Sequence, residues 1–358
     1  MIKRIILVFL LLSMFALPAT AYDDVSEYIT EEMEELLPED ILEEEGGISY
    51  SSLWQVLKQG MGDVLAIAIR NITSVFAVVI LSAVFSVLSS SVGSKGIQKA
   101  LSYLCVGCIA MSVYSVLSSV WTDMTELLDK INTFMVSLTP VTTLLYSMGG
   151  NITAAAVNNT GMGIILTVFE TICYHGITPM LRICFGFSLI SALSGDINLA
   201  PIAKFVRRSY TTVIVFVMSS LICILSLQNM LTAPKDSLGI RTVKFAAANS
   251  IPIVGSALGE AAATVGVGIS AIRGSLGVLA VLAIAIMVLP VIASMWVNKL
   301  SFSLMSSICA VFGLSKEEGL LSGAAELMNF ALAITLSSSA MFIISISVFA
   351  MARVVMGG

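Results

Sequence analysis

Several separate runs of about 20 apolar residues are the feature that most constrains this chain. An α-helix rises 1.5 Å per residue, so about 20 residues cross a hydrocarbon layer roughly 30 Å thick. A backbone exposed to lipid must satisfy its own N–H and C=O groups, which here favours helices. Of the 358 residues, 57% are hydrophobic and 11% are charged, whereas soluble domains carry about 25% charged residues. The sequence therefore predicts an all-α, polytopic helical membrane protein and not a soluble enzyme.

The first 21 residues have the pattern of an export signal. Lys3 and Arg4 precede an apolar run, and the small-residue pattern Ala19-Thr20-Ala21 follows it. Cleavage after Ala21 would make Tyr22 the first mature residue, on the extracytoplasmic side of the membrane. An uncleaved anchor is the alternative. We therefore assign a signal peptide to residues 1–21.

Acidic residues are concentrated just after this signal. Twelve of the 23 acidic residues lie between Asp23 and Glu45, in a stretch without Lys or Arg. Apolar residues recur there at spacings of three and four, which predicts an amphipathic extracytoplasmic segment over 22–47. A partner-docking helix and a solvated acidic linker both fit this pattern. The apolar face of the next stretch, 48–70, predicts a helix that lies in the headgroup layer.

Hydropathy predicts six to eight spans in the rest of the chain. A first membrane hairpin and an amphipathic helix closed by Pro140 occupy 71–140, and a multi-span membrane domain occupies 141–358. Lys95 and Lys99 connect the hairpin and fall inside the cell if the mature N-terminus lies outside. Pro290 is expected to break one span, and the piece 183–193 is too short to cross unless it is tilted or re-entrant. The apolar segments are 72–92, 100–120, 161–179, 183–193, 211–230, 275–297, 301–314 and 327–351.

Two further patterns concern how these segments are arranged. From Trp121 to Leu138 the apolar residues step by three and one, and the opposite face is charged. Such a helix suits an interface or partner helices better than a span. In the C-terminal half, 161–227 and 275–351 share the order span, proline, short apolar piece, polar connector and span. This order predicts an internal repeat, a feature of many transporter folds.

Ionisable residues at membrane depth are the candidate functional residues, because each is costly unless it is paired. Glu170, Glu260 and Glu326 are these polar candidates. His175 follows Glu170 by five positions, about 140° around an α-helix, so the two cannot share one face as acid and base or as metal ligands. No hydrolase motif occurs, no nucleotide-binding motif has its required context, and the six cysteines suit apolar packing. We expect no catalytic residue, no metal and no cofactor.

The most distinctive stretch is the Gly- and Ala-rich segment after the basic loop at 234–250. Gly255, Gly259 and Ala263 are spaced by four, so one helix face is nearly bare and another backbone can approach it closely. Together with Pro252 they are the predicted helix-packing and assembly residues. Glu260 lies on the adjacent polar stripe. This stripe either rests at a helix interface, or it lines a conduit or seals a subunit contact.

The order of these features resembles the stage III sporulation protein AE family of endospore-forming bacteria. The export signal, the acidic segment, the apolar C-terminal half and above all the core Ser250-Ile-Pro-Ile-Val-Gly-Ser-Ala-Leu-Gly-Glu260 carry the resemblance. It implies a non-enzymatic multi-pass subunit of the sporulation channel complex that joins mother cell and forespore, in the mother-cell membrane around the forespore. The partners that it implies are other membrane subunits of the complex, a secretion-type ATPase and a forespore membrane protein, and no nucleic acid. An autonomous secondary transporter of a small solute is the alternative, motivated by the repeat and by Glu170 and Glu260.

Overall fold

The computed structural model describes residues 50–90, 95–148, 152–194, 199–220, 223 and 255–351, and these ranges are helical apart from short turns. The predicted all-α class is therefore confirmed. A further helix, over 200–220, belongs with the named elements. These are α3 (Tyr50–Ser90), α4 (Lys95–Met148), α5 (Ile152–Phe169), the π-helix η3 (Glu170–Tyr174), α6 (His175–Ser194), α8 (Gly255–Val311) and α9 (Ser315–Met351).

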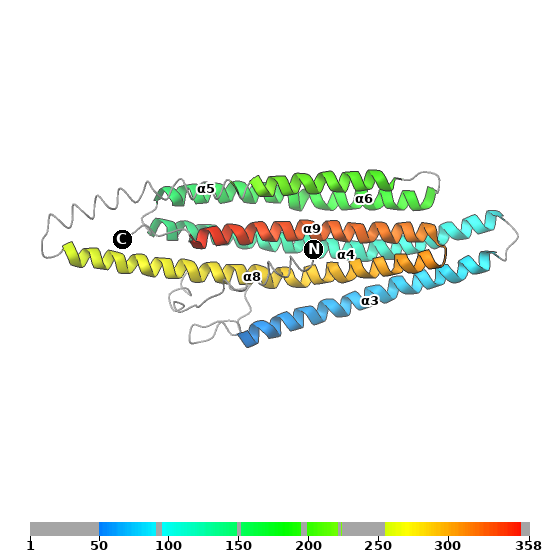
Figure 1. The fold of residues 1–358 in the computed structure, drawn as a ribbon, viewed down its shortest axis with the longest axis horizontal. Coiled ribbons are helices and arrows are strands. Elements are labelled where there is room, and N and C mark those ends of the chain that lie inside the picture. Colours follow the sequence, from blue (N-terminus) through cyan, green and yellow to red (C-terminus); the bar gives the residue numbers. More distant parts are fainter. Residues whose placement is uncertain are drawn as a thin grey trace.

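The helices run side by side along one long axis and form an elongated bundle (Figure 1). α8 and α9 are joined by a short turn and have the most extensive contact among the named helices. α3 packs on α8 and α4, α4 also packs on α5 and α9, and α6 packs on α9 and α4. α4 packs on every other named element, so it lies at the centre of the bundle.

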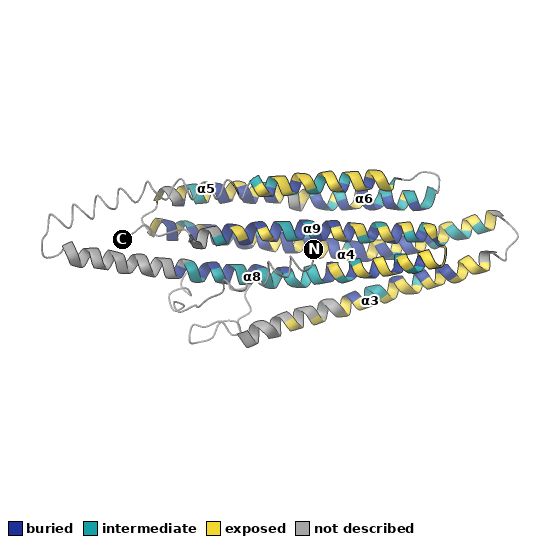
Figure 2. Ribbon diagram, viewed as in Figure 1, coloured by how far each residue is buried: buried dark blue, intermediate teal, exposed yellow. Residues whose placement is uncertain are grey.

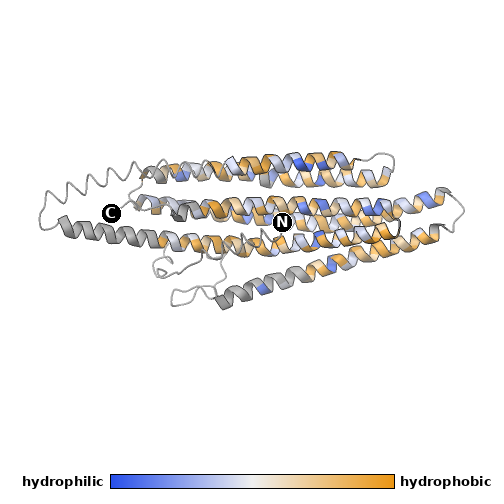
Figure 3. Cartoon of the chain, viewed as in Figure 1, coloured by the Kyte–Doolittle hydropathy of each residue, from blue (hydrophilic) through white to orange (hydrophobic). Residues whose placement is uncertain are grey.

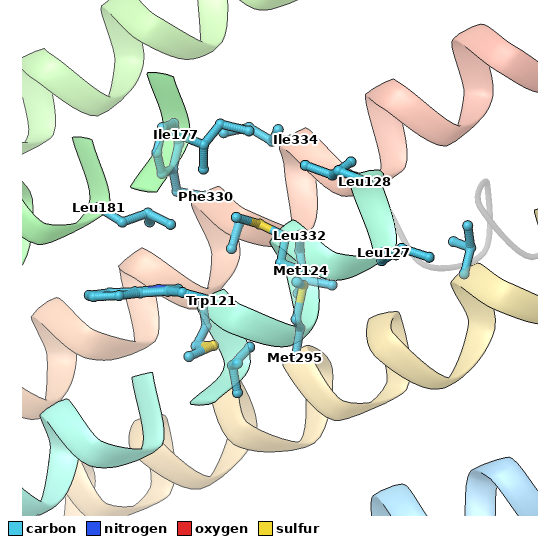
Figure 4. Packing of buried hydrophobic residues seen from close by; sticks show 14 of the residues in the cluster. Trp121, Met124, Leu127, Leu128, Ile177, Leu181, Met295, Phe330, Leu332 and Ile334 are labelled. Atoms are coloured by element: carbon cyan, nitrogen blue, oxygen red, sulfur yellow. The ribbon is translucent and has the colours of Figure 1, made fainter. Parts of the chain in front are cut away.

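The core is built from apolar residues that four helices contribute to a common layer. Figure 4 shows this packing at the middle of the bundle, with labelled side chains from each of the four. They are Trp121, Met124, Leu127 and Leu128 of α4, Ile177 and Leu181 of α6, Met295 of α8, and Phe330, Leu332 and Ile334 of α9. All apolar positions that step by three and one between Trp121 and Leu138 are buried, whereas the charged face between them is exposed. The two faces of this stretch lie as its periodicity requires.

The outer side of α3 is both exposed and apolar, as Figures 2 and 3 show together. Its exposed large side chains are Ile67, Ile69, Phe76, Ile80, Leu81, Val84, Phe85, Val87 and Leu88. A contiguous apolar surface of this kind is costly in water and marks a membrane or protein contact. This surface is what a lipid-facing helix requires.

Five helical segments among the described residues are long and apolar enough to cross a membrane. They are Ala66–Leu88, Gly96–Met148, Ala155–Ser194, Gly274–Val311 and Ser315–Ser347. The predicted count of six to eight spans is not confirmed by these five. α4 has 54 residues, about 80 Å at 1.5 Å per residue, which is far more than one crossing of roughly 30 Å needs. The number of helices therefore does not by itself give the number of crossings.

Several breaks expected from the sequence do not occur. The predicted interfacial helix and the first span form one continuous helix, α3, and 183–193 is the end of the 40-residue segment Ala155–Ser194. Pro140 lies inside α4 and Pro290 lies inside α8, so the predictions that Pro140 closes a helix and that Pro290 breaks one are wrong. Proline removes one hydrogen bond from an α-helix, but it is tolerated inside apolar helices because neighbouring groups and local adjustments satisfy the freed carbonyl.

Some sequence-based assignments lie outside the described residues. These are the signal peptide over 1–21, the acidic segment over 22–47 and the basic loop over 234–250. The domain boundaries, the headgroup-layer position of 48–70 and the internal repeat also stay predictions.

Candidate functional site

A tight turn joins α8 to α9 and determines where α9 begins. Gly313 has a φ of 70°, a left-handed conformation that glycine adopts without a steric cost. The N–H of Leu314 donates to the Cys309 carbonyl at 2.9 Å, and the N–H of Gly313 donates to the Ala310 carbonyl at 3.1 Å. These are the two hydrogen bonds of a Schellman motif, which ends α8 and reverses the chain.

Replacing Gly313 by Ala should destabilise this turn. Nothing lies within 4 Å of a Cβ at this position, so the cost is the left-handed backbone alone, about 1–2 kcal/mol. Gly319 in α9 is the matched control, because a Cβ there also meets nothing within 4 Å and its backbone is helical. Gly319→Ala should be neutral or stabilise by up to about 1 kcal/mol. Thermal unfolding in one detergent, followed by tryptophan fluorescence, checks both; equal melting temperatures for the two variants would contradict the prediction.

A polar cavity of about 170 Å³ lies beside this turn, between α3, the start of α4 and the first turn of α9. Four serine hydroxyls, a thiol, an ammonium group and a carboxylate contribute to its lining. The residues are Ser82, Ser86, Ser102, Ser315, Cys105, Lys316 and Glu317. We call it the Glu317 cavity.

Glu317 carries the buried charge of this cavity. The residue is 5% exposed, and the hydroxyl of Ser82 donates to its Oε1 at 3.2 Å. The Lys316 ammonium lies over the ring of Tyr103, 4.5 Å from its centroid. Among the described residues, Lys316 and Glu317 form no ion pair. The Lys316 ammonium therefore does not form an ion pair with the Glu317 carboxylate.

The position of Glu317 at the start of α9 does not compensate for its burial. A glutamate at this position often accepts a hydrogen bond from the N-cap amide, but the Leu314 amide is already bonded to Cys309. The helix dipole favours a carboxylate in the first turn by about 0.3–1 kcal/mol. Burying an ion costs several kcal/mol. The Ser82 hydrogen bond and the helix dipole together offset only part of the cost of burying the Glu317 charge.

A second polar contact joins the 200–220 helix to α9. Arg207 is 8% exposed, and its Nη2 donates to the carboxylate of Glu326. Its Nη1 is buried and has no hydrogen-bond partner in the part of the chain that the structure describes. The Glu326 side chain remains about half exposed. Glu326 lies within the candidate span Ser315–Ser347, and a charge embedded in a membrane needs a partner of this kind.

A third contact lies at the π-helix between α5 and α6. The hydroxyl of Tyr210 donates to the Ile172 carbonyl in η3 at 2.7 Å, and its ring meets that of Phe330 edge to face at 5.9 Å. A Cβ on Gly176 would overlap the Tyr210 hydroxyl. Gly176 is therefore the position that lets the 200–220 helix approach the helix formed by η3 and α6.

The sequence model of the stage III sporulation protein AE family matches residues 31–353. The chain belongs to this family. Comparisons with curated proteins and with solved structures gave no match. The resemblance seen in the sequence is thereby confirmed for nearly the whole length of the chain.

The structure describes the surroundings of some, but not all, of the candidate residues predicted from the sequence of this family member. Glu326 is paired with Arg207, and Glu170 is exposed at the start of η3. Gly255, Gly259 and Ala263 lie within α8, so their spacing of four does place them on one helix face. Nothing is described of the side chain of Glu260 or of the surroundings of this face, and Pro252 lies outside the described residues. The packing and assembly role stays a prediction.

Sequence reasoning missed Ser82, Arg207, Tyr210 and Glu317 as contact residues. In the sequence, Glu317 belongs to the polar connector Lys316-Glu317-Glu318 between the apolar segments 301–314 and 327–351, and a connector of this kind does not by itself indicate a buried contact. Among the described residues, no group of three His, Cys, Asp or Glu could hold a metal ion.

Proposed function

We propose that this chain is a non-enzymatic multi-pass membrane subunit of the sporulation channel complex that links mother cell and forespore and is needed for forespore development. Membership of the stage III sporulation protein AE family is the observation that carries the proposal. In this proposal the chain lies in the mother-cell membrane around the forespore. Its mature N-terminus is extracytoplasmic after the export signal over 1–21, and it crosses the membrane six to eight times. Its partners are other membrane subunits, a secretion-type ATPase and a forespore membrane protein.

A charged surface on α4 supports a role as a subunit. Asp123, Glu126, Asp129 and Lys130 are exposed near the middle of this long helix, and the Lys130 ammonium lies 2.8 Å from Glu126. Charged side chains that face lipid tails cost several kcal/mol each. This face therefore suits water or a polar partner, and α4 is long enough to extend beyond a bilayer.

Affinity purification from detergent-solubilised sporulating cells tests the proposal directly. A tagged chain should recover other membrane subunits and the ATPase, and an untagged strain processed in parallel should recover none of them. Recovery of the chain alone, together with uptake of a defined solute by liposomes that contain only this protein, would support the autonomous transporter instead.

Two neighbouring substitutions sharpen the same experiment. Gly259→Leu should prevent close helix approach, because a leucine side chain cannot fit where glycine allowed it. Overpacking of this kind costs about 1–3 kcal/mol, so we expect partner recovery to fall roughly 5- to 150-fold. Glu260→Gln keeps the side-chain size and should leave recovery unchanged. Normal recovery with Gly259→Leu, combined with loss of sporulation in Glu260→Gln, would favour the conduit role for this segment.

A further inference from the structure

We propose that the Glu317 cavity binds an alkali-metal cation, with the Glu317 carboxylate as its anionic ligand and serine hydroxyls as neutral ligands. The inference rests on the geometry beside the α8–α9 turn and does not depend on the channel role.

The lining of the cavity has the chemistry of a site for a hard cation. The Glu317 carboxylate is 5% exposed, and hydroxyls from α3, α4 and α9 surround the same space. Carboxylate, hydroxyl and water oxygens are the ligands that hard cations prefer. Ser82 donates its hydroxyl hydrogen to Glu317 at 3.2 Å, which leaves the lone pairs of the serine oxygen directed elsewhere.

The charge of the site favours a monovalent ion. Glu317 is the one carboxylate among the residues that line the cavity, and the neighbouring Glu318 is not among them. Lys316 also lines the cavity, and its ammonium lies over the Tyr103 ring at 4.5 Å in a cation–π contact, so Glu317 has no direct ion-pair partner among the described residues. Because the Lys316 charge remains in the lining, a monovalent ion adds less net positive charge to this cavity than a divalent ion does.

The size and position of the cavity predict the effect of a bound ion on thermal stability. Its volume of about 170 Å³ exceeds the roughly 10–15 Å³ that one water needs by the same kind of measure, so a partly hydrated ion fits. Its walls come from three helices: α3 and α4, which follow one another in the sequence, and α9, the last of the named helices. A bound ion would hold them together, and a ligand that binds only the folded state raises thermal stability.

Thermal unfolding of the purified full-length protein in detergent tests the inference. The melting temperature is measured at constant ionic strength and pH in NaCl, in KCl and in the chloride of the large cation N-methyl-D-glucamine. We expect Na⁺ or K⁺ to raise it by about 3 °C or more over the organic cation. Glu317→Gln, which keeps the shape of the side chain, should lose this rise. Glu318→Gln, the same chemical change at the neighbouring carboxylate that does not line the cavity, is the matched control and should retain it, while Ser82→Ala should raise the ion concentration needed for half of the rise.

Three results would overturn the inference. The first is a melting temperature of the wild-type protein that is the same in all three salts. The second is a rise that Glu317→Gln retains, which would show a general salt effect. The third is a melting temperature that depends on pH but not on the cation, which would show that Glu317 is neutralised by a proton. Equilibrium dialysis with radioactive ²²Na⁺ measures binding without heating. Binding of ²²Na⁺ by Glu317→Gln at the wild-type level would equally reject the site.

Discussion

Replacing Glu326 by Ala should lower the free energy of unfolding by about 3 kcal/mol, the lower end of the range for breaking a buried ion pair. The substitution leaves the guanidinium of Arg207 at 8% exposure without the carboxylate that it binds. Its Nη1 already lacks a hydrogen-bond partner among the described residues. Arg207→Met should cost less, because the Glu326 carboxylate that remains is about half exposed and an apolar side chain replaces the buried charge.

A double-mutant cycle checks this asymmetry. Thermal unfolding in detergent is compared for the wild type, the two single variants and Arg207→Met/Glu326→Ala. Replacing both partners of a buried pair is often nearly neutral, so the double variant should be more stable than Glu326→Ala alone. Equal costs for the two single changes would contradict the predicted asymmetry, and a double variant whose loss equals the sum of the single losses would show that the pair contributes no coupling.

The fold class could be predicted because it depends on properties that the sequence carries locally. Apolar runs of about 20 residues require helices in lipid. The spacing of residues between Trp121 and Leu138 gives the buried face of that part of α4 correctly, since helical periodicity alone determines which side chains share a face.

Helix ends were harder to predict because they depend on competition between local and surrounding interactions. Pro140 and Pro290 are expected to end or break a helix, because a proline removes one helical hydrogen bond. In α4 and α8 the helices continue through these residues. The cost of one lost bond is smaller than that of ending a helix, which leaves several unpaired polar groups. The Gly313 turn, by contrast, is a true end.

The polar contacts could not be predicted because their partners are distant in the sequence. Ser82 and Glu317 are 235 positions apart, and Arg207 and Glu326 are 119 apart. Periodicity says which face a residue occupies and nothing about which helix packs there. The angle inferred for Glu170 and His175 assumed an α-helix, whereas residues 170–174 form the π-helix η3, whose wider turn changes that angle.

Gly176→Ala should lower the free energy of unfolding by about 1–3 kcal/mol, because the higher helix propensity of Ala offsets only about 1 kcal/mol of the cost of the clash and of the lost hydrogen bond. The new Cβ would overlap the Tyr210 hydroxyl, so the tyrosine must move away from η3. Overpacking costs about 1–3 kcal/mol. The lost hydrogen bond to the Ile172 carbonyl, 2.7 Å long in the wild type, costs about 1 kcal/mol more. Gly163→Ala is the matched control, because a Cβ there meets nothing within 4 Å in the same continuous helical segment.

The clash itself can be isolated with a second substitution. Tyr210→Phe removes the overlapping oxygen, after which the nearest ring atom lies 3.4 Å from the added Cβ, an ordinary contact. Tyr210→Phe alone should cost about 1 kcal/mol, the value of its hydrogen bond. Gly176→Ala/Tyr210→Phe should therefore be more stable than Gly176→Ala in thermal unfolding, even though it carries one more change from the wild type. If adding Tyr210→Phe lowered stability further, the 200–220 helix would not approach the helix formed by η3 and α6 at Gly176.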